Sequence, residues 1–124
     1  MFTSVDGGLE RVTVNVTNQI EPSIPMGIHC KSKDTDLGEH PAIDYGGSIH
    51  WKFKVNLWGT TLYWCNIWYV DASGRQIQGS FNIFEADRDV SWCHGFCLRF
   101  VKKGGIYFDL PGTNTSQLMY EWPH

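Results

Sequence analysis

Hydrophobic and polar residues alternate along several short segments of this chain. Residues 12–17 read Val-Thr-Val-Asn-Val-Thr. Because successive side chains of a β-strand point to opposite sides, this alternation predicts a strand with one buried and one exposed face. The same period of two predicts further strands in the segments 26–30, 49–55, 77–83, 98–101, 106–110 and 118–122. Strands are therefore the main element expected in this chain.

Residues 60–70 differ from the other segments because they are apolar or aromatic on both faces. This pattern predicts a central strand that is covered on both sides, or one that presents an aromatic face to another molecule. Trp58, Trp64 and Trp68 lie in or beside this strand. We interpret them as core residues, since large aromatic side chains contribute much burial energy. The alternative is an exposed platform that stacks on sugars or docks a protein.

Glycine-containing turns separate the expected strands, at residues 6–8, 45–47, 71–74, 103–105 and 111–114. No segment combines a helical stripe of apolar residues with helix caps. About eight short strands joined by such turns predict an all-β fold, an antiparallel β-sandwich. A length of 124 residues suits one domain. We expect residues 1–124 to form a single sandwich domain, in which residues 1–10 are a flexible N-terminal segment.

Charge and hydropathy narrow the classes of partner. Ten Lys and Arg residues stand against 13 Asp and Glu residues, a net charge of −3 without a basic run. Nucleic acids and anionic membranes are therefore unfavourable partners. The longest nearly apolar stretch, residues 62–70, is interrupted by Asn66, whereas a membrane-spanning helix needs about 20 residues. We expect no membrane insertion, and we expect any secretion signal to have been removed from this chain.

Four cysteines form an even set in this small aromatic-rich chain: Cys30, Cys65, Cys93 and Cys97. An even number of cysteines in a small chain predicts a secreted, extracellular domain with disulfide bonds. The alternative is four reduced thiols packed in a cytosolic core. N-glycosylation sequons begin at Asn15 and at Asn114. These sequons also favour an extracellular glycoprotein.

The spacing of the cysteines bears on how they pair. Cys93 and Cys97 enclose only the three residues 94–96, so a bond between them would remove little entropy from the unfolded chain. Bonds to Cys30 and Cys65 would close much longer loops and stabilise the fold more. Among the three pairings that four cysteines allow, we favour the nested one, Cys30–Cys97 with Cys65–Cys93.

The sequence carries no recognisable catalytic motif. It lacks the G-x-S-x-G elbow, the phosphate-binding glycine loop and the H-E-x-x-H pair, and its histidines are scattered. We predict that the protein is not an enzyme and has no cofactor. A zinc site is an alternative use of the soft ligands His29, Cys30, Cys93, His94 and Cys97. Their spacing departs from paired C-x-x-C knuckles, so we favour disulfides and predict no metal site.

Residues 34–38 contain two aspartates and a glycine, as the start of a calcium-binding loop does. The glycine stands one position early, and the distant glutamate that completes such a loop is absent. The flanking segments also favour strands rather than helices. We interpret the segment as a solvated turn.

Residues 29–38, which read His-Cys-Lys-Ser-Lys-Asp-Thr-Asp-Leu-Gly, resemble a signature of the plant self-incompatibility protein family, whose members are also called S-protein homologues. Residues 51–65, which end in Trp-Gly-Thr-Thr-Leu-Tyr-Trp-Cys, are similar to the next hallmark of that family. The two late cysteines and residues 105–107 follow in the same order. The resemblance covers most of the chain from Val12 onwards.

The resemblance implies a small secreted plant protein with an antiparallel β-sandwich and intramolecular disulfides. The founding members are stigma ligands of the poppy type of self-incompatibility, which a partner on incompatible pollen recognises and whose signal arrests pollen growth. This chain departs from the family pattern at Thr35, which interrupts an acidic triplet. It also departs at residues 98–100, where the family often has a tryptophan.

We therefore predict a secreted signalling ligand that binds a cell-surface protein receptor through charged loops on a rigid frame. The loops are residues 31–40 and 85–91. Their candidate receptor-binding residues are Lys31, Lys33, Asp34, Asp36, Glu85, Asp87, Arg88 and Asp89. The alternative is a lectin-like module that binds glycans through exposed Trp and Tyr side chains. The sequence leaves the receptor and the oligomeric state open.

Overall fold

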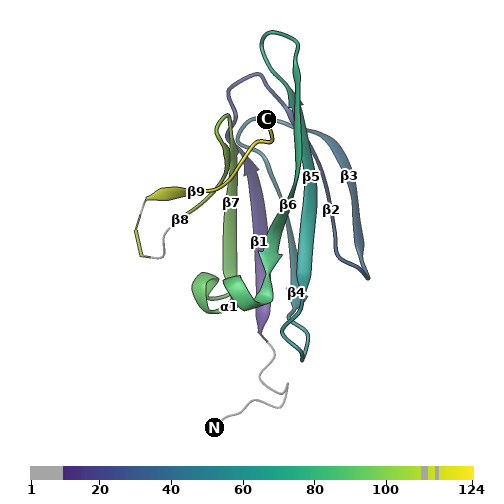
Figure 1. The fold of residues 1–124 in the computed structure, drawn as a ribbon, viewed down its shortest axis with the longest axis vertical. Helices are drawn as coiled ribbons and strands as arrows, with labels where there is room; N and C mark the ends of the chain where they lie inside the picture. Colours follow the sequence, from purple (N-terminus) through teal and green to yellow (C-terminus); the bar gives the residue numbers. More distant parts are fainter. Residues whose placement is uncertain (1–9, 110–111, 114) are drawn as a thin grey trace.

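The computed structural model describes residues 10–109, 112–113 and 115–124, and these residues form nine strands and one helix (Figure 1). The elements in chain order are β1 (Arg11–Asn18), β2 (Met26–Lys31), β3 (Asp36–Ile43), β4 (Ser48–Lys54), β5 (Leu62–Val70), β6 (Gln76–Glu85), α1 (Ala86–Cys93), β7 (Phe96–Lys102), β8 (Gly105–Asp109) and β9 (Ser116–Glu121). The expected flexible segment lies, apart from residue 10, outside the described residues, as does the sequon residue Asn114.

The strands form two sheets that face each other as layers (Figure 1). One is a five-stranded sheet in the order β4-β1-β7-β8-β9, and the other is a four-stranded sheet in the order β3-β2-β5-β6. The pairings between described strands are antiparallel except that between β1 and β7, which run parallel. The predicted all-β sandwich is confirmed, with one parallel pair that the alternation pattern does not predict.

The core lies between the sheets and follows the alternation of each strand. In β1, Val12, Val14 and Val16 are buried, while the threonines and asparagine between them are half-exposed. In β5, Cys65 and Ile67 are fully buried. β5 pairs with β2 on one side and with β6 on the other, so it is an inner strand of the four-stranded sheet.

The predicted loop at residues 31–40 contains a strand. β3 begins at Asp36 and pairs with β2 through an irregular register. Alternation did not reveal this strand because Gly38 and Pro41 interrupt it and most of its side chains are exposed. Such residues are tolerated in a strand that forms the edge of a sheet, where one side of the backbone needs no partner.

The second predicted loop, residues 85–91, is largely helical. α1 spans Ala86–Cys93 and is too short for a repeated apolar stripe to appear in the sequence. Two acidic residues lie in its first turn, where negative charge is favourable beside the positive end of the helix dipole. The helix ends at Cys93, and the next two residues, His94 and Gly95, have φ values of 51° and 91° that turn the chain into β7.

The disulfides are Cys30–Cys65 and Cys93–Cys97, so the cysteines are oxidised as predicted but the nested pairing is wrong. Cys30 and Cys65 are register partners on β2 and β5, and their Cα atoms are 4.0 Å apart. The tight turn after α1 brings the Cα atoms of Cys93 and Cys97 to 5.0 Å. Proximity in the fold, rather than the entropy of the closed loop, decides which thiols can meet. Neither bond links a strand of one sheet to a strand of the other.

The two disulfides should stabilise the fold unequally, because their sequence separations are 35 and 4 residues. Loop entropy gives a contribution of about 4 kcal/mol for the longer loop and about 2 kcal/mol for the shorter one. We expect Cys30→Ala with Cys65→Ala to lower the free energy of unfolding in urea more than Cys93→Ala with Cys97→Ala. A larger loss for the second pair would contradict this ranking.

Candidate functional site

The segments that carry the predicted receptor-binding residues lie at one end of the sandwich (Figure 1). β2 ends at Lys31 beside Trp64 near the start of β5, and β6 ends at Glu85 beside Leu62. The segments that follow or precede these strands therefore share that end. We call it the loop end, and it consists of the β2–β3 turn (residues 32–35), the β4–β5 loop (residues 55–61) and α1.

The β2–β3 turn is ordered by Ser32. Its backbone N–H donates to the carbonyl of Thr35 at 2.8 Å, and its hydroxyl accepts from the backbone N–H groups of Asp34 and Thr35 at 3.3 and 3.1 Å. Lys33 and Asp34 are exposed at the tip of this turn. The turn therefore presents one cation and one anion to solvent in a defined geometry.

Asp36 is the first residue of β3, and its side chain makes two contacts within the chain. Its Oδ1 lies 2.6 Å from His29 Nε2 and accepts from the backbone N–H of Gly38 at 2.9 Å. The pKa of Asp36 is lowered, first by the Gly38 hydrogen bond and then by that of His29. Because Asp36 is exposed, it keeps a face toward solvent while it also fastens β3 to β2.

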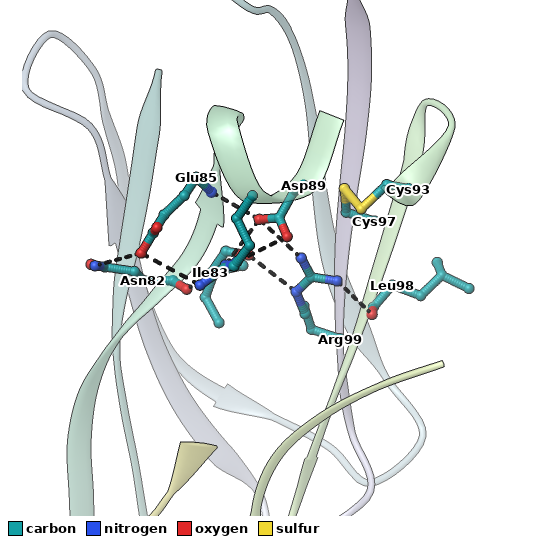
Figure 2. The surroundings of a disulfide bond; sticks show 9 residues. Asn82, Ile83, Glu85, Asp89, Cys93, Cys97, Leu98 and Arg99 are labelled. Carbon is teal, nitrogen blue, oxygen red and sulfur yellow. Dashed lines mark hydrogen bonds and ion pairs between the residues drawn. A yellow bond between two sulfur atoms is a disulfide. The ribbon is translucent and has the colours of Figure 1, made fainter. Parts of the chain in front are cut away.

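Asp89, in contrast, is buried and serves the fold. Its carboxylate accepts from the backbone N–H of Glu85 at 2.8 Å and from Arg88 Nε and Nη2 at 3.0 and 2.9 Å. It also lies 3.4 Å from Nη2 of Arg99, a buried arginine of β7 (Figure 2). A carboxylate that is 2% exposed cannot contact a receptor, so the prediction for Asp89 is wrong.

Arg99 ties the helix to both sheets. It extends from β7 of the five-stranded sheet, and its Nε donates to the carbonyl of Ile83 in β6 of the four-stranded sheet at 3.1 Å. Its Nη1 donates to the carbonyl of Leu98 at 3.1 Å. Burial lowers the pKa of Arg99 to about 10, and the charge of Asp89 opposes that fall. The guanidinium stays charged at neutral pH and needs the carboxylate beside it.

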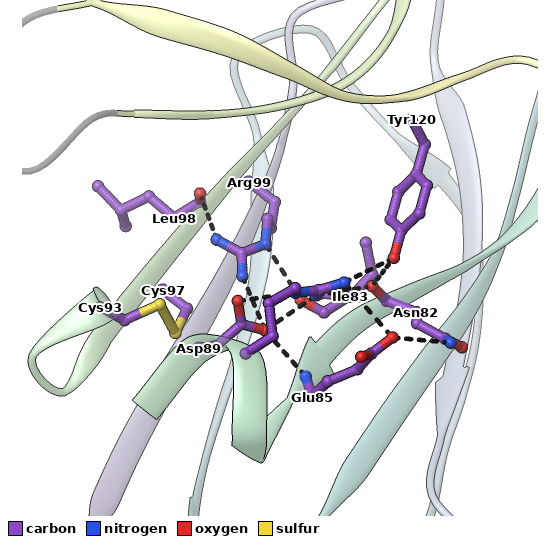
Figure 3. A network of polar contacts seen from close by, with 10 residues as sticks. Asn82, Ile83, Glu85, Asp89, Cys93, Cys97, Leu98, Arg99 and Tyr120 are labelled. Atoms are coloured by element: carbon purple, nitrogen blue, oxygen red, sulfur yellow. Dashed lines mark hydrogen bonds and ion pairs between the residues drawn. A yellow bond between two sulfur atoms is a disulfide. The ribbon is translucent and has the colours of Figure 1, made fainter. Parts of the chain in front are cut away.

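Arg88 also acts mainly within the fold. Its Nη1 donates to the hydroxyl of Tyr120 in β9 at 2.7 Å, and that hydroxyl donates to the carbonyl of Asn82 in β6 at 2.9 Å (Figure 3). Burial opposes the charge of Arg88, but the hydrogen bonds and charges of Asp89 and Tyr120 outweigh this effect and raise its pKa. Glu85 lies 3.4 Å from Arg88 Nη1 and is half-buried. Asp87 is the exposed charge of this helix.

The sequence interpretation missed the most exposed aromatic side chain of the loop end. Leu57 and Trp58 are 68% and 80% exposed, so the placement of Trp58 in the core is wrong. Asn56 fixes the shape of their loop: its side chain accepts from the Thr60 N–H and donates to the Thr60 hydroxyl, both at 2.9 Å. Gly59 supplies the φ of 70° that the turn requires. The pair Trp58-Gly59, typical of a turn rather than a strand, was the available signal.

Trp64 and Trp68 are not core residues either. They alternate with the buried Tyr63, Cys65 and Ile67 on β5, so both face outward from the four-stranded sheet, where they are half-buried. Of the two interpretations of residues 60–70, the structure supports the strand that shows an aromatic face to its surroundings.

A cavity of about 370 Å³ opens beside α1, against β8 and β9. Its lining is mostly aromatic and apolar, and Arg88, Asp89 and Arg99 are among its polar residues. Among the residues that the structure describes, no histidine, cysteine, serine or lysine lines it. The charged groups that reach it are already engaged with one another, so the arrangement supplies a structural network rather than a nucleophile and base.

The remaining sequence predictions concern a zinc site, a membrane-spanning segment and glycosylation. The zinc alternative is wrong because its cysteines are disulfide-bonded, and within the described part of the chain no group of three or more His, Cys, Asp or Glu side chains is placed to hold a metal ion. None of the helical residues described here forms a segment long and apolar enough to cross a membrane.

Asn15 is half-exposed on β1 and accepts from the Thr17 hydroxyl at 3.0 Å. Glycosylation of Asn15 stays a prediction.

Comparison with known proteins identifies the family. The family described as "Plant self-incompatibility protein S1" matches residues 13–122. The chain belongs to this family. It is 36% identical to S-protein homolog 24 of Arabidopsis thaliana over 118 residues, which cover 95% of this chain and 72% of that protein. It is 40% identical to S-protein homolog 27 of the same plant over 114 residues, which cover 90% of this chain and 68% of the relative.

A solved structure shares the fold of this S-protein homologue. It belongs to the SPH (Self-Incompatibility Protein Homologue) proteins, described as "a widespread family of small, highly stable, secreted proteins from plants". The two chains superpose with a TM-score of 0.65, and the match covers 94% of this chain and 98% of the other. At 20% sequence identity, this likeness concerns the fold alone. The family resemblance noted in the sequence is confirmed.

Loss of the Asp89 carboxylate should destabilise the fold, because it would leave Arg99 buried without an opposite charge. We expect Asp89→Asn to lower the free energy of unfolding in urea by about 3 kcal/mol. Asp87→Asn, on the exposed side of the same helix, is the matched control and should change it by no more than about 0.5 kcal/mol. Equal effects of the two substitutions would show that the buried network does not hold α1.

Only part of the lowering of the Asp36 pKa should depend on His29. We expect His29→Ala to raise this pKa but to leave it below the ordinary value of 3.8, because the Gly38 hydrogen bond remains. A lowered pKa means that the charged carboxylate stabilises the fold above its ordinary pKa, and that this contribution is lost as pH falls through the folded value. The variant should therefore lose less stability on acidification. Carboxyl titration by NMR measures the shift, and an unchanged pKa would contradict the pairing.

Proposed function

We propose that this S-protein homologue is a secreted plant ligand that binds a cell-surface protein through its loop end. The observation that carries the proposal is the pair Leu57 and Trp58, which are 68% and 80% exposed on a loop whose shape is fixed by Asn56. Large exposed apolar side chains on a rigid loop are typical of interaction sites rather than of inert surface.

The composition of the loop end favours a protein partner. Tryptophan is enriched among the residues that dominate binding energy at protein interfaces, and such residues are commonly surrounded by a polar rim. Here Trp58 supplies the apolar centre, and Lys33 and Asp34 supply exposed charges on the β2–β3 turn at the same end. Burial of the Leu57 side chain alone is worth about 1.5 to 3 kcal/mol. The charges are expected to affect the rate of association more than its final strength.

The frame beneath the loop end supports the same function. Asn56 orders the β4–β5 loop, Ser32 orders the β2–β3 turn and Asp89 fixes α1. A surface that is ordered before binding loses less conformational entropy when the complex forms. The disulfides of this chain and the description of related SPH proteins as secreted support an extracellular location. Binding without catalysis is part of the proposal.

The test is binding of the fluorescently labelled protein to intact plant cells. We expect saturable binding that is lost after the cells are treated with protease. Leu57→Ser with Trp58→Ser should weaken this binding at least about tenfold, the loss of roughly 1.4 kcal/mol or more. Tyr45→Ser is the control, since Tyr45 is 47% exposed in the turn between β3 and β4, outside the loop end.

Charge reversal at the turn provides a second measurement. Lys33→Glu with Asp34→Lys keeps the net charge and should slow association at low salt while leaving the dissociation rate nearly unchanged. Equal binding by the Leu57 and Trp58 double variant, or binding that resists protease treatment, would overturn the proposed function.

A further inference from the structure

The outer face of the four-stranded sheet carries tryptophans and neutral hydrogen-bonding side chains. On β5 the outward residues include Trp64, Asn66 and Trp68, because they alternate with the buried Cys65 and Ile67. Their register partners on β6 are Asn82, Ser80 and Gln78, which are all exposed. We call these six residues the tryptophan–amide face.

The indole of Trp68 lies flat on this sheet. Its register partner on β2 is Gly27, and a Cβ atom at Gly27 would fall 2.0 Å from Cε2, 2.2 Å from Nε1 and 2.4 Å from Cζ2 of the indole. These three similar distances place that position over the ring face rather than beyond its edge. Because side chains stand roughly perpendicular to a sheet, the ring is parallel to the sheet. One π-face rests on the β2 backbone, and the other points outward.

Trp64 extends the aromatic surface along the same strand. It stands four residues before Trp68, which corresponds to about 13 Å at the rise of an extended strand. Asn66 is exposed between the two rings. The aromatic positions are therefore too far apart for one sugar ring, and their spacing suits an extended chain of several rings.

The six residues of the face are neutral, and charged side chains border them on β2, where Lys31 is the register partner of Trp64 and His29, which contacts Asp36, is that of Asn66. Asn66 and Ser80 make no side-chain hydrogen bond to any described residue, so their donors and acceptors are open to a ligand. Gln78 accepts from the side chain of Gln76 at 2.7 Å, which leaves its own amide N–H groups as donors. Asn82 donates its amide N–H to the carboxylate of Glu85 at 3.0 Å, so it offers a ligand fewer open groups than Asn66 and Ser80 do.

This combination matches the chemistry of a neutral oligosaccharide. A pyranose ring has an apolar C–H face that packs on an aromatic ring, and its equatorial hydroxyl groups exchange hydrogen bonds with amides and hydroxyls. An acidic polysaccharide would instead favour a row of lysines or arginines, as anionic polymers do in general. We infer that the tryptophan–amide face binds a neutral, extended oligosaccharide along β5. This site is separate from the loop end and goes beyond the proposed function.

The test is isothermal titration calorimetry of the intact protein with cellohexaose, mannohexaose and xylohexaose, with hexagalacturonate as the acidic comparison. We expect at least one neutral hexasaccharide to bind and hexagalacturonate to bind more weakly. Trp68→Ala should weaken the binding at least about tenfold, in line with the loss of a central aromatic contact. Gln78→Ala should weaken it by a smaller factor, through loss of hydrogen bonds.

Two further variants separate this site from folding effects and from the loop end. Gly27→Ala keeps every side chain of the face but displaces the Trp68 indole, so it should also weaken sugar binding. Its fold is checked by the NMR spectrum of the buried core. Trp58→Ala removes the exposed tryptophan of the loop end and should leave sugar binding within about twofold of wild type.

Several results would overturn the inference. They are absence of binding to all three neutral hexasaccharides at millimolar concentration, unchanged binding in folded Trp68→Ala, and binding of hexagalacturonate alone. Self-association of the chain that Trp68→Ala abolishes, seen in sedimentation velocity, would assign the face to a second copy instead. A loss of cell binding in the Leu57 and Trp58 double variant with sugar binding intact would keep the two sites distinct.

Discussion

Val14 of β1 and Ile67 of β5 are both fully excluded from water between the two sheets, and this burial decides which side of each strand faces solvent. A shift of either strand by one residue would expose its apolar side chains and bury polar ones. The outward positions of the tryptophan–amide face are consequences of the same constraint. The loops at the strand ends are free of it, and there Leu57 and Trp58 are exposed.

Arg99 places a charge on the largely apolar inner face, and this charge gives α1 a structural role. It occupies a buried position of β7, so its guanidinium requires hydrogen-bond acceptors and a negative charge within the sandwich. Asp89 supplies the charge, and the carbonyl groups of Ile83 and Leu98 supply acceptors. The short helix carries Asp89 to that position. Two charges that look like surface residues in the sequence are therefore part of the interior.

The strands with clear alternation were predictable because a half-buried strand needs that pattern and few other structures produce it. β3 lacked the signal, since an edge strand with Gly38 and Pro41 buries little. The pairing of cysteines was not predictable, because the register of β2 on β5 places Cys30 beside Cys65, and register depends on the whole fold.

At the candidate site, the exposed charges of Lys33, Asp34 and Asp87 could be proposed from polarity alone. The burial of Asp89 could not, since its contact with Arg99 depends on how α1 packs against β7.

Both covalent cross-links are local: one joins neighbouring strands of a single sheet, and the other spans the turn after α1. Each bond can form as soon as its own strand pair or turn exists, before the two layers dock. Oxidation of the cysteines therefore imposes no order on the assembly of the two layers. With no sulfur bridge between the sheets, exclusion of water and the polar contacts around Arg99 keep the halves together once the chain has matured.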